Sequence, residues 1–358
     1  MTTTTTAQAP AFDEAKLMEL VGKCVGDFGA LLSGTLVSIG DRLGLFKAIA
    51  AAGEVTPAEL AKRTGTSERY VREWLAAMAA SEYITYAGGG RFTLTPEQRE
   101  AFTNEESPGY MIGGFQGMTA ATRAFPKVIE AFRSGQGVGW HEHDADLFKG
   151  TERFFRPGYA ANLVEAWLPA LDGVVDKLKA GARVADVGCG HGASTIIMAK
   201  AFPQSQFVGF DYHAASIDAA REAAKGAGLK NVTFDVASAK EYPGTYDLVC
   251  HFDCLHDMGD PVGAAKRVYD SLNDGGTWLL VEPNAGDDIA QNLNPVGRVF
   301  YSASTLICTP ASLAQEVGAA LGAQAGEARL REVAQQAGFT RFRRATETPF
   351  NLVLEGKK

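Results

Sequence analysis

Three alternating glycines that follow an acidic residue form the stretch of this sequence best suited to hold a ligand. An apolar run ends in Asp186, and Gly188, Gly190 and Gly192 come at alternate positions after it. Glycine lacks a Cβ and tolerates positive φ, so the backbone of such a loop can approach a ligand closely. The pattern before the loop predicts a strand and residues 194–202 predict a helix, which together indicate a nucleotide-binding crevice.

The charge and spacing of this loop indicate which nucleotide it would hold. A pyrophosphate site usually has the spacing G-x-G-x-x-G, whereas this loop reads G-x-G-x-G and its Asp186 would repel an anion. S-adenosylmethionine carries an ammonium and a sulfonium group, which a carboxylate attracts. The next expected strand, over residues 206–210, ends in Asp211, where a carboxylate can accept both ribose hydroxyls. We therefore expect S-adenosylmethionine as the cofactor. The alternatives are a nicotinamide-dependent oxidoreductase and an ordinary glycine-rich turn.

Methyl transfer to a hydroxyl also requires a group that removes a proton. This base should lie near the carboxyl ends of the strands, which is where the segment that leaves the strand expected over residues 246–252 begins. It contains His256, and an unperturbed imidazole titrates near pH ~6.5 and can accept a proton in the cell. His256 is therefore the candidate base, with a role in capping a loop or helix as the alternative. His251 lies within the apolar strand, where we expect it to be packed.

From about residue 180 to residue 357 the sequence resembles the class I S-adenosylmethionine-dependent methyltransferases, whose first motif matches the loop at residues 186–192. Residues 255–260 are similar to the segment in which winged-helix O-methyltransferases keep their catalytic histidine, followed here by Asp257. A methionine, Met258, replaces the usual tryptophan.

The resemblance also implies the partners of the base. The family keeps a glutamate beside the histidine, and the matching residue at the end of the fifth strand is Glu282. The catalytic residues implied are therefore His256, Glu282 and Asp257, with Glu282 orienting or polarising the imidazole.

Adenine recognition departs from the family pattern. The family often has an acidic residue just after the third strand, where this chain has Ala237, Ser238 and Ala239. We expect Ser238 to replace the acid, with backbone groups of Ala239 beside it, and Phe252 to pack against the cofactor. The expected cofactor-binding residues are Asp186, Gly188, Gly190, Gly192, Asp211, Ser238, Ala239 and Phe252.

Two stretches contain residue types that can ligate a metal. Catechol-type methyltransferases hold a divalent metal through neighbouring Asp and Asn side chains, and Asp253 could begin such a site. The end of the fifth strand, residues 282–284, supplies nothing that completes it. Residues 141–144 read His-Glu-His-Asp but lack a third ligand at a recognised spacing. We expect no metal.

Strands and helices alternate after the loop, which predicts an α/β fold with a doubly wound, Rossmann-like sheet. The expected segments are strands at 232–236, 246–252 and 277–281 and helices at 214–226 and 261–272. Residues 340–345 and 350–355 read as a terminal hairpin, and the resemblance implies a seven-stranded sheet with an antiparallel last strand.

The N-terminal part predicts a mainly helical winged-helix domain. Thr56 is a plausible helix cap with Pro57 at the first helical position, and Gly65 would end that helix. A second helix from Ser67 is followed by two short β runs joined by a glycine-rich turn, a hairpin by its turn chemistry.

A winged helix can bind DNA, which makes a cofactor-sensing transcriptional regulator the alternative function. The second helix carries Arg69 and Arg72, but Glu68 and Glu73 lie beside them and cancel their charge. We expect no nucleic acid partner. The apolar helix over residues 28–39 exceeds what a three-helix unit can bury, and the resembling enzymes dimerise through this domain, so we expect a homodimer.

Length and composition predict a soluble two-domain protein. The formal net charge is −8, and the five cysteines lack C-x-x-C pairing, which favours reduced thiols. No run of eighteen apolar residues occurs, and the N-terminus lacks the features of a secretory signal. We therefore expect a cytoplasmic enzyme without a membrane partner.

Four segments are expected: a disordered tail (1–12), a winged-helix dimerisation domain (13–107), a helical linker and substrate cover (108–179) and a methyltransferase domain (180–358). The aromatic residues of the third segment suit either a cover over an apolar pocket or inter-domain core. They are Phe148, Phe154, Phe155, Tyr159 and Trp167. The predicted acceptor is a small, aromatic molecule, with oxygen favoured because the base is a histidine and nitrogen or sulfur as alternatives.

Overall fold

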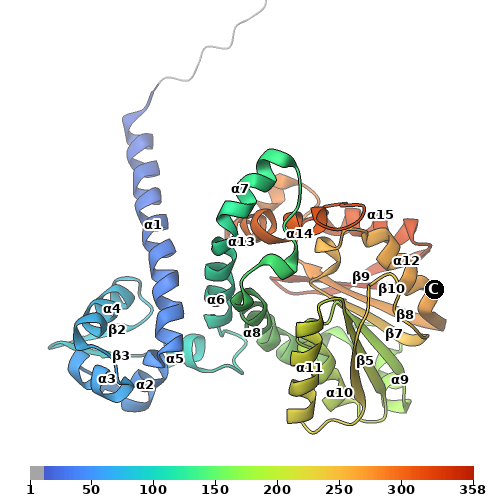
Figure 1. Ribbon diagram of the computed structural model, residues 1–358, viewed down its shortest axis with the longest axis horizontal. Coiled ribbons are helices and arrows are strands. Elements are labelled where there is room, and N and C mark those ends of the chain that lie inside the picture. Colours follow the sequence, from blue (N-terminus) through green and yellow to red (C-terminus); the bar gives the residue numbers. More distant parts are fainter. Residues whose placement is uncertain (1–11) are drawn as a thin grey trace, which may run out of the picture. The chain divides into compact units, whose positions relative to one another are not determined.

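The computed structural model describes residues 12–358, so the predicted disordered tail (1–12) lies outside the described residues except for Phe12. The described residues divide into two compact units, one that ends at Arg99 and one over Glu100–Lys358 (Figure 1).

The first unit has the predicted winged helix. A capping box begins α3, because the Glu59 backbone N–H donates to the Thr56 hydroxyl and the Thr56 N–H donates to the Glu59 carboxylate. Gly65 ends this helix with a φ of 67°. Helix α4 packs its apolar face, including Trp74 and Met78, into the core. The elements after α1 are α2 Leu45–Ala52, β1 Glu54–Val55, α3 Pro57–Thr64, α4 Glu68–Ala80, β2 Thr85–Gly88 and β3 Arg91–Thr93.

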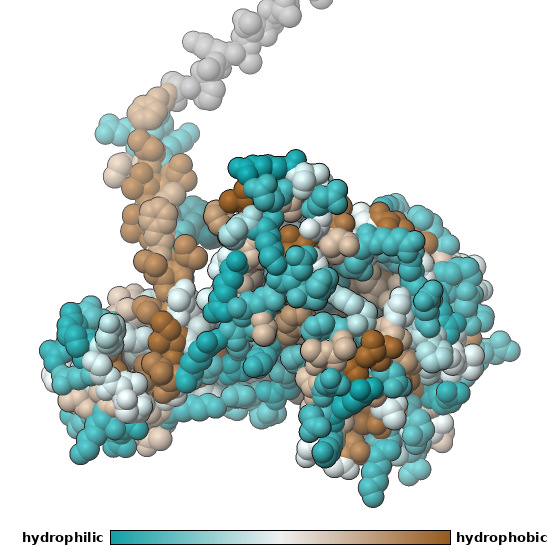
Figure 2. Space-filling model, in the orientation of Figure 1, coloured by the Kyte–Doolittle hydropathy of each residue, from teal (hydrophilic) through white to brown (hydrophobic). Residues whose placement is uncertain are grey.

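Helix α1, Glu14–Arg42, exposes a long row of apolar side chains, drawn in brown in Figure 2. The exposed residues are Leu17, Met18, Leu20, Val21, Val25, Phe28, Leu31, Leu32 and Ile39. Among the described residues, α1 is the one helix long and apolar enough to cross a membrane by length and composition alone. An ion pair between Lys23 and Asp27 lies on its surface. The apolar row is far larger than the scattered apolar residues of an ordinary surface.

The second unit is built on a seven-stranded sheet with strand order β6-β5-β4-β7-β8-β10-β9. Its strands are β4 Arg183–Val187, β5 Gln206–Asp211, β6 Val232–Val236, β7 Tyr246–Phe252, β8 Leu272–Pro283, β9 Arg341–Glu347 and β10 Asn351–Lys357. Strands β4 to β8 pair in parallel, and β10 pairs antiparallel with both β8 and β9. This confirms the predicted α/β fold and antiparallel last strand.

Helices cover both faces of this sheet (Figure 1). Helices α12 and α15 pack in the apolar cluster on one face, and α9, α10 and the end of α8 pack in the cluster on the other. Because helices bury both faces, the central strands read as continuous apolar runs. The helices after α4 are α5 Pro96–Thr103, α6 Ile112–Ala121, α7 Phe125–Ser134, α8 Ala145–Asn162, α9 Val174–Ala180, α10 Ala193–Ala201, α11 Ala214–Gly226, α12 Pro261–Ser271, α13 Pro295–Ala303, α14 Thr309–Leu313 and α15 Gly326–Gln336.

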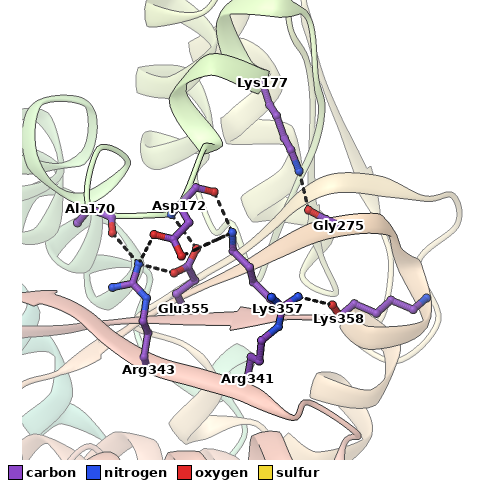
Figure 3. Close-up of polar contacts among 9 residues, drawn as sticks. All are labelled: Ala170, Asp172, Lys177, Gly275, Arg341, Arg343, Glu355, Lys357 and Lys358. Atoms are coloured by element: carbon purple, nitrogen blue, oxygen red, sulfur yellow. Dashed lines mark hydrogen bonds and ion pairs between the residues drawn. The ribbon is translucent and has the colours of Figure 1, made fainter.

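A buried carboxylate fastens the C-terminal hairpin to the rest of the unit (Figure 3). Glu355 on β10 is 2% exposed and forms ion pairs with Arg343 at 2.5 Å and Lys357 at 3.5 Å. It also accepts a hydrogen bond from the backbone N–H of Asp172 at 2.9 Å. Arg343 in turn donates to the carbonyl of Ala170. The hairpin is thereby tied to the turn that precedes α9.

Candidate active site

A cavity with a volume of about 400 Å³ opens at the carboxyl ends of β4, β5, β6 and β7. Open α/β sheets bind their ligands at this edge, where the strand order reverses. The loop after β4 and the residues that follow the neighbouring strands form its floor, and α8 supplies its cover. The predicted cofactor-binding residues that line it are Gly188, Gly190, Asp211, Ser238, Ala239 and Phe252.

The glycine loop leads from β4 into α10. A Cβ at Gly190, where φ is 52°, would meet no protein atom within 4 Å. The backbone there is therefore open to a ligand. Gly192 does not line the cavity; a Cβ there would lie 2.7 Å from the Phe234 ring, so this glycine lets the helix pack closely against its neighbour.

Asp186 is fully buried and is not among the residues that line the cavity. Its Oδ2 accepts hydrogen bonds from the hydroxyls of Ser194 and Thr195, at 2.6 and 2.7 Å, and so ties β4 to the start of α10. Its Oδ1 has no hydrogen-bond partner. Burial raises the pKa of Asp186 to about 6, although the two hydroxyls lower it. Asp186 is thus placed to shape the loop, whereas the sequence suggested a direct attraction to the ligand.

Asp211 ends β5 and faces the cavity. Its Oδ2 accepts the backbone N–H of Gly190 at 3.0 Å, and its Oδ1 accepts that of His213 at 2.8 Å. Each oxygen retains a further lone pair, which suits a pair of ribose hydroxyls. Burial raises the pKa of Asp211, and the hydrogen bonds oppose this shift.

The open glycine backbone and the cavity-facing carboxylate of Asp211 fit a nucleoside, and the further carboxylates that line the cavity, such as Asp253 and Asp257, suit one with a positively charged tail. Two further lining residues, Tyr212 and His213, are not singled out by any sequence motif. Phe148 on α8 stacks on His213 with ring centroids 4.7 Å apart, and Tyr212 also lines the cavity. Tyr212 and His213 directly follow Asp211 in the sequence, and this adjacency to a predicted cofactor-binding residue is the one signal that could have identified them.

The predicted aromatic cover is divided by the structure. Phe148, Phe155 and Tyr159 line the cavity, whereas Trp167 belongs to the buried cluster on one face of the sheet. Phe154 is not a lining residue and packs edge-on against Phe155. Some residues of this segment therefore cover the cavity, and others belong to the core.

His256 and Glu282 are brought together. His256 lies in the short turn Leu255–Asp257 after β7, and its Nδ1 is 2.5 Å from Glu282 Oε2 near the end of β8. The other oxygen of Glu282 accepts the backbone N–H of Leu255 at 2.9 Å. Burial lowers the pKa of His256, but the charge of Glu282, the Cys308 side chain and hydrogen bonds to both together outweigh it and hold this pKa well above its ordinary value. His251, by contrast, is buried in β7, and its Nδ1 accepts a hydrogen bond from the ring N–H of Trp278 at 3.1 Å.

The cavity reaches the neighbours of His256 without reaching His256. Asp257 and Met258 line it, whereas His256 and Glu282 do not, and they are 5% and 2% exposed. Asp257 accepts a hydrogen bond from the Trp140 ring nitrogen at 2.7 Å. Burial raises the pKa of Asp257 to about 6. Trp140 thus fastens the segment before α8 next to the histidine.

Within residues 12–358, no group of three or more His, Cys, Asp or Glu side chains is placed to hold a metal ion. The His141–Asp144 stretch is instead engaged locally. Glu142 pairs with Lys127 and Asp144 caps the N-terminus of α8. Asp253 belongs to no such group in the described part of the chain, and its oxygens accept hydrogen bonds from the side chains of Tyr159 and Asn351.

This loop, sheet and paired histidine define a class I methyltransferase with an N-terminal winged helix. Residues 178–338 match the family described as a methyltransferase domain, and residues 31–104 match the Rv2258c-like winged helix-turn-helix domain. These matches confirm the predicted class, whose cofactor is S-adenosylmethionine. Each match covers less than half of the chain.

Relatives and solved structures agree with this assignment. A trans-aconitate 2-methyltransferase of Deinococcus radiodurans is 32% identical over 112 residues, which are 31% of this chain and 42% of the relative. The chain thus spans less than half the length of such curated relatives. Human N-acetylserotonin methyltransferase in complex with S-adenosylmethionine superimposes with a TM-score of 0.71 at 16% identity, covering 98% of this chain and 99% of that one.

An O-methyltransferase of neocarzinostatin biosynthesis, NcsB1, superimposes with a TM-score of 0.62 at 20% identity. The match covers 90% of this chain and 95% of that one, whose structure contains S-adenosylhomocysteine and 1,4-dihydroxy-2-naphthoic acid. Identities this low establish a shared fold.

Proposed function

We propose that this protein transfers a methyl group from S-adenosylmethionine to a hydroxyl of a small aromatic acceptor, with His256 as the general base. The observation that carries the proposal is the contact of 2.5 Å between His256 Nδ1 and Glu282, next to a cavity floored by the glycine loop. A nicotinamide-dependent reaction has no such support, because the loop lacks the spacing of a pyrophosphate site.

Each residue of the pair has a defined task. Bound S-adenosylmethionine supplies an electrophilic methyl group. Glu282 accepts a hydrogen bond from the Nδ1–H of His256, which leaves Nε2 as the atom that takes the proton of the acceptor hydroxyl. The same carboxylate stabilises the imidazolium formed in that step, consistent with the raised pKa of His256. Asp257 is proposed to position the histidine turn through its bond to Trp140.

An acceptor can reach His256 only if its surroundings rearrange, because the imidazole does not line the cavity. The segment that carries Trp140 is the part of the cover bonded to the histidine turn. We infer that this segment moves when the acceptor enters. Gly135, with a φ of 73°, ends α7 just before it and supplies a turn that other residues rarely adopt.

The aromatic lining favours a flat acceptor. Trp140, Phe148, Phe155 and Tyr159 all contribute to the cavity walls, and aromatic rings pack well against such side chains. NcsB1, which shares the fold, has a dihydroxynaphthoic acid in its structure. Oxygen is preferred to nitrogen or sulfur because a hydroxyl is the acceptor that most needs a histidine base.

We further propose a cytoplasmic homodimer that uses α1 as its interface. The apolar row on α1, with Phe28 and Leu31 each about two-thirds exposed, is the surface that a second copy would cover. A DNA-binding regulator is disfavoured, since Arg69 pairs with Glu73 and Arg72 with Glu68 on α4 itself. These arginines are thus already neutralised where a recognition helix would need positive charge.

The proposal is tested by a screen of phenols, thiols and amines with isotopically labelled S-adenosylmethionine. The expected result is label transfer to one or more phenols, retained in the presence of a chelator. Transfer to amines or thiols alone would overturn the oxygen preference. Loss of activity in chelator with recovery on adding magnesium would overturn the predicted metal independence. Absence of binding to S-adenosylmethionine or S-adenosylhomocysteine, after removal of any copurified ligand, would overturn the enzymatic function itself.

A further inference from the structure

Asp253 is a carboxylate that three separate elements hold at the wall of the cavity. It directly follows β7, and its Oδ2 accepts a hydrogen bond from the Tyr159 hydroxyl of α8 at 2.8 Å. Its Oδ1 accepts one from the Asn351 side chain of β10 at 2.9 Å. Its φ of 50° lies in the left-handed region, which aspartate and asparagine tolerate better than most residues. The carboxylate is therefore fixed in one place.

The Asp253 carboxylate lies beside the glycine loop. Strands β4 and β7 pair in parallel with Asp186 opposite Cys250, so the segment after β7 emerges next to the loop after β4. The two are in close contact, because a Cβ at Gly188 would lie 2.7 Å from the sulfur of Cys254. Gly188 and Asp253 line the same cavity.

The carboxylate has hydrogen bonds but, within the described residues, no lysine or arginine partner. Tyr159 and Asn351 are neutral, and no lysine or arginine in the described part of the chain forms an ion pair with Asp253. Burial and the charge of nearby Glu282 raise the pKa of Asp253 to about 7, although His256 and the two hydrogen bonds lower it. A buried carboxylate without a counterion is costly, so a cationic ligand group would stabilise it.

A second carboxylate, that of Asp211, lines the cavity on the other side of the glycine loop. In the strand order β5-β4-β7, Asp211 follows β5 and Asp253 follows β7, one on each side of the glycine loop. Two strand spacings separate them by roughly 10 Å. The ribose hydroxyls and the amino-acid end of S-adenosylmethionine lie on opposite sides of its sulfur, so a molecule lying across the loop would present one group to each carboxylate.

On the basis of the methyltransferase function proposed above, we propose that Asp253, held by Tyr159 and Asn351, binds the α-ammonium group of the methionyl end of S-adenosylmethionine. Asp253 is thus a positioning residue for the methyl donor. It fixes the tail while Asp211 fixes the ribose, which aligns the sulfur between them with the acceptor side of the cavity.

The test compares two ligands that differ in this group. S-adenosylhomocysteine has the ammonium, and 5′-methylthioadenosine has the same nucleoside without the amino acid. Their affinities are measured by calorimetry on ligand-free full-length wild type and Asp253→Asn, with thermal melting to show that the variant is folded. A hydrogen bond between charged groups contributes on the order of 1.5–3 kcal/mol, so we expect Asp253→Asn to weaken S-adenosylhomocysteine about 10- to 150-fold. The affinity for 5′-methylthioadenosine should change less than about twofold.

Two further variants serve as controls for this interpretation. Glu152→Gln removes a negative charge from the same cavity, where Glu152 on α8 pairs with Arg156 at 2.9 Å. It should leave the ratio of the two affinities unchanged. Tyr159→Phe removes one of the bonds that fix Asp253, and it should weaken S-adenosylhomocysteine severalfold and 5′-methylthioadenosine little.

The outcomes separate this inference from the function on which it rests. Wild type that binds S-adenosylhomocysteine, with Asp253→Asn binding it equally well, overturns the role of Asp253 alone. Equal weakening of both ligands by Asp253→Asn also overturns it, because the substitution would then act on the nucleoside site. Wild type that binds neither ligand overturns the methyltransferase function and this inference together.

Discussion

Replacing Glu282 by glutamine tests the proposed base most directly, because it removes one charge and little else. The amide oxygen of Glu282→Gln can still accept the backbone N–H of Leu255, a bond of 2.9 Å in the wild type. The carboxylate 2.5 Å from His256 Nδ1 is lost. A hydrogen bond between charged groups contributes about 1.5–3 kcal/mol. If that stabilisation is present mainly when the imidazole is protonated, the methylation rate should fall about 10- to 150-fold.

The substitution should also move the pH dependence in a defined direction. Glu282, together with Cys308, holds the pKa of His256 well above its ordinary value. The base acts only when it is deprotonated, so the wild-type rate should rise as the pH rises through this raised pKa. Without the carboxylate the pKa of His256 falls, and the rise in rate should shift to lower pH in Glu282→Gln.

Two measurements check this reasoning. Single-turnover transfer of labelled methyl to a phenol found in the screen gives the rate against pH, and nitrogen NMR of the imidazole rings follows His256 without an acceptor. Calorimetry with S-adenosylhomocysteine is the control, since Glu282 does not line the cavity and its loss should leave this affinity nearly unchanged. A variant with a wild-type rate and an unshifted pH profile would refute the proposed pairing.

Three other perturbations have expected outcomes. Burial raises the pKa of Asp186 from 3.8 to about 6, so the ligand-free protein should lose about 3 kcal/mol of stability as pH rises through this window, and urea unfolding of Asp186→Asn should show less of that loss. Replacing both Arg343 and Lys357 by methionine leaves the buried Glu355 without a cation. This should lower the free energy of unfolding in urea by about 3–5 kcal/mol, and adding Glu355→Leu should recover most of the loss. Wild-type stability of the double variant would contradict the argument that the buried charge needs these partners. Phe28→Glu places a charge in the apolar row of α1 and should convert a dimer to a monomer in light scattering, and an unchanged mass would exclude this face as the interface.

The order of strands and helices could be predicted from the sequence because periodicity and turn residues agree with each other. The strand expected over residues 246–252 and the helix expected over 214–226 have the observed bounds of β7 and α11. The strand expected over 277–281 proved longer, Leu272–Pro283. Its first residues include Asp274 and two glycines, which local propensity disfavours in a strand, and pairing with β7 begins there nevertheless.

The site could be predicted less fully from the sequence, because a carboxylate at the end of a strand can face either the protein interior or the cavity. Asp186, Asp211 and Asp253 all lie at or near the carboxyl ends of parallel strands. Asp186 is turned toward the hydroxyls at the start of α10, whereas the other two face the cavity. Asp253 depends on Asn351, which is distant in sequence, and on the hydroxyl of Tyr159. No local pattern encodes such a convergence of three elements.

These placements give the cavity an electrostatic preference that suits a methyl donor. Asp211, Asp253 and Asp257 line it, and burial raises the pKa of each of these carboxyl groups. A positively charged ligand lowers the cost of ionising them, which is a gain that a neutral ligand does not provide. Transfer of the methyl group removes the positive charge from sulfur, so the same carboxylates hold the product less strongly than the donor. The acidic cavity would therefore favour both capture of the donor and its exchange after the reaction.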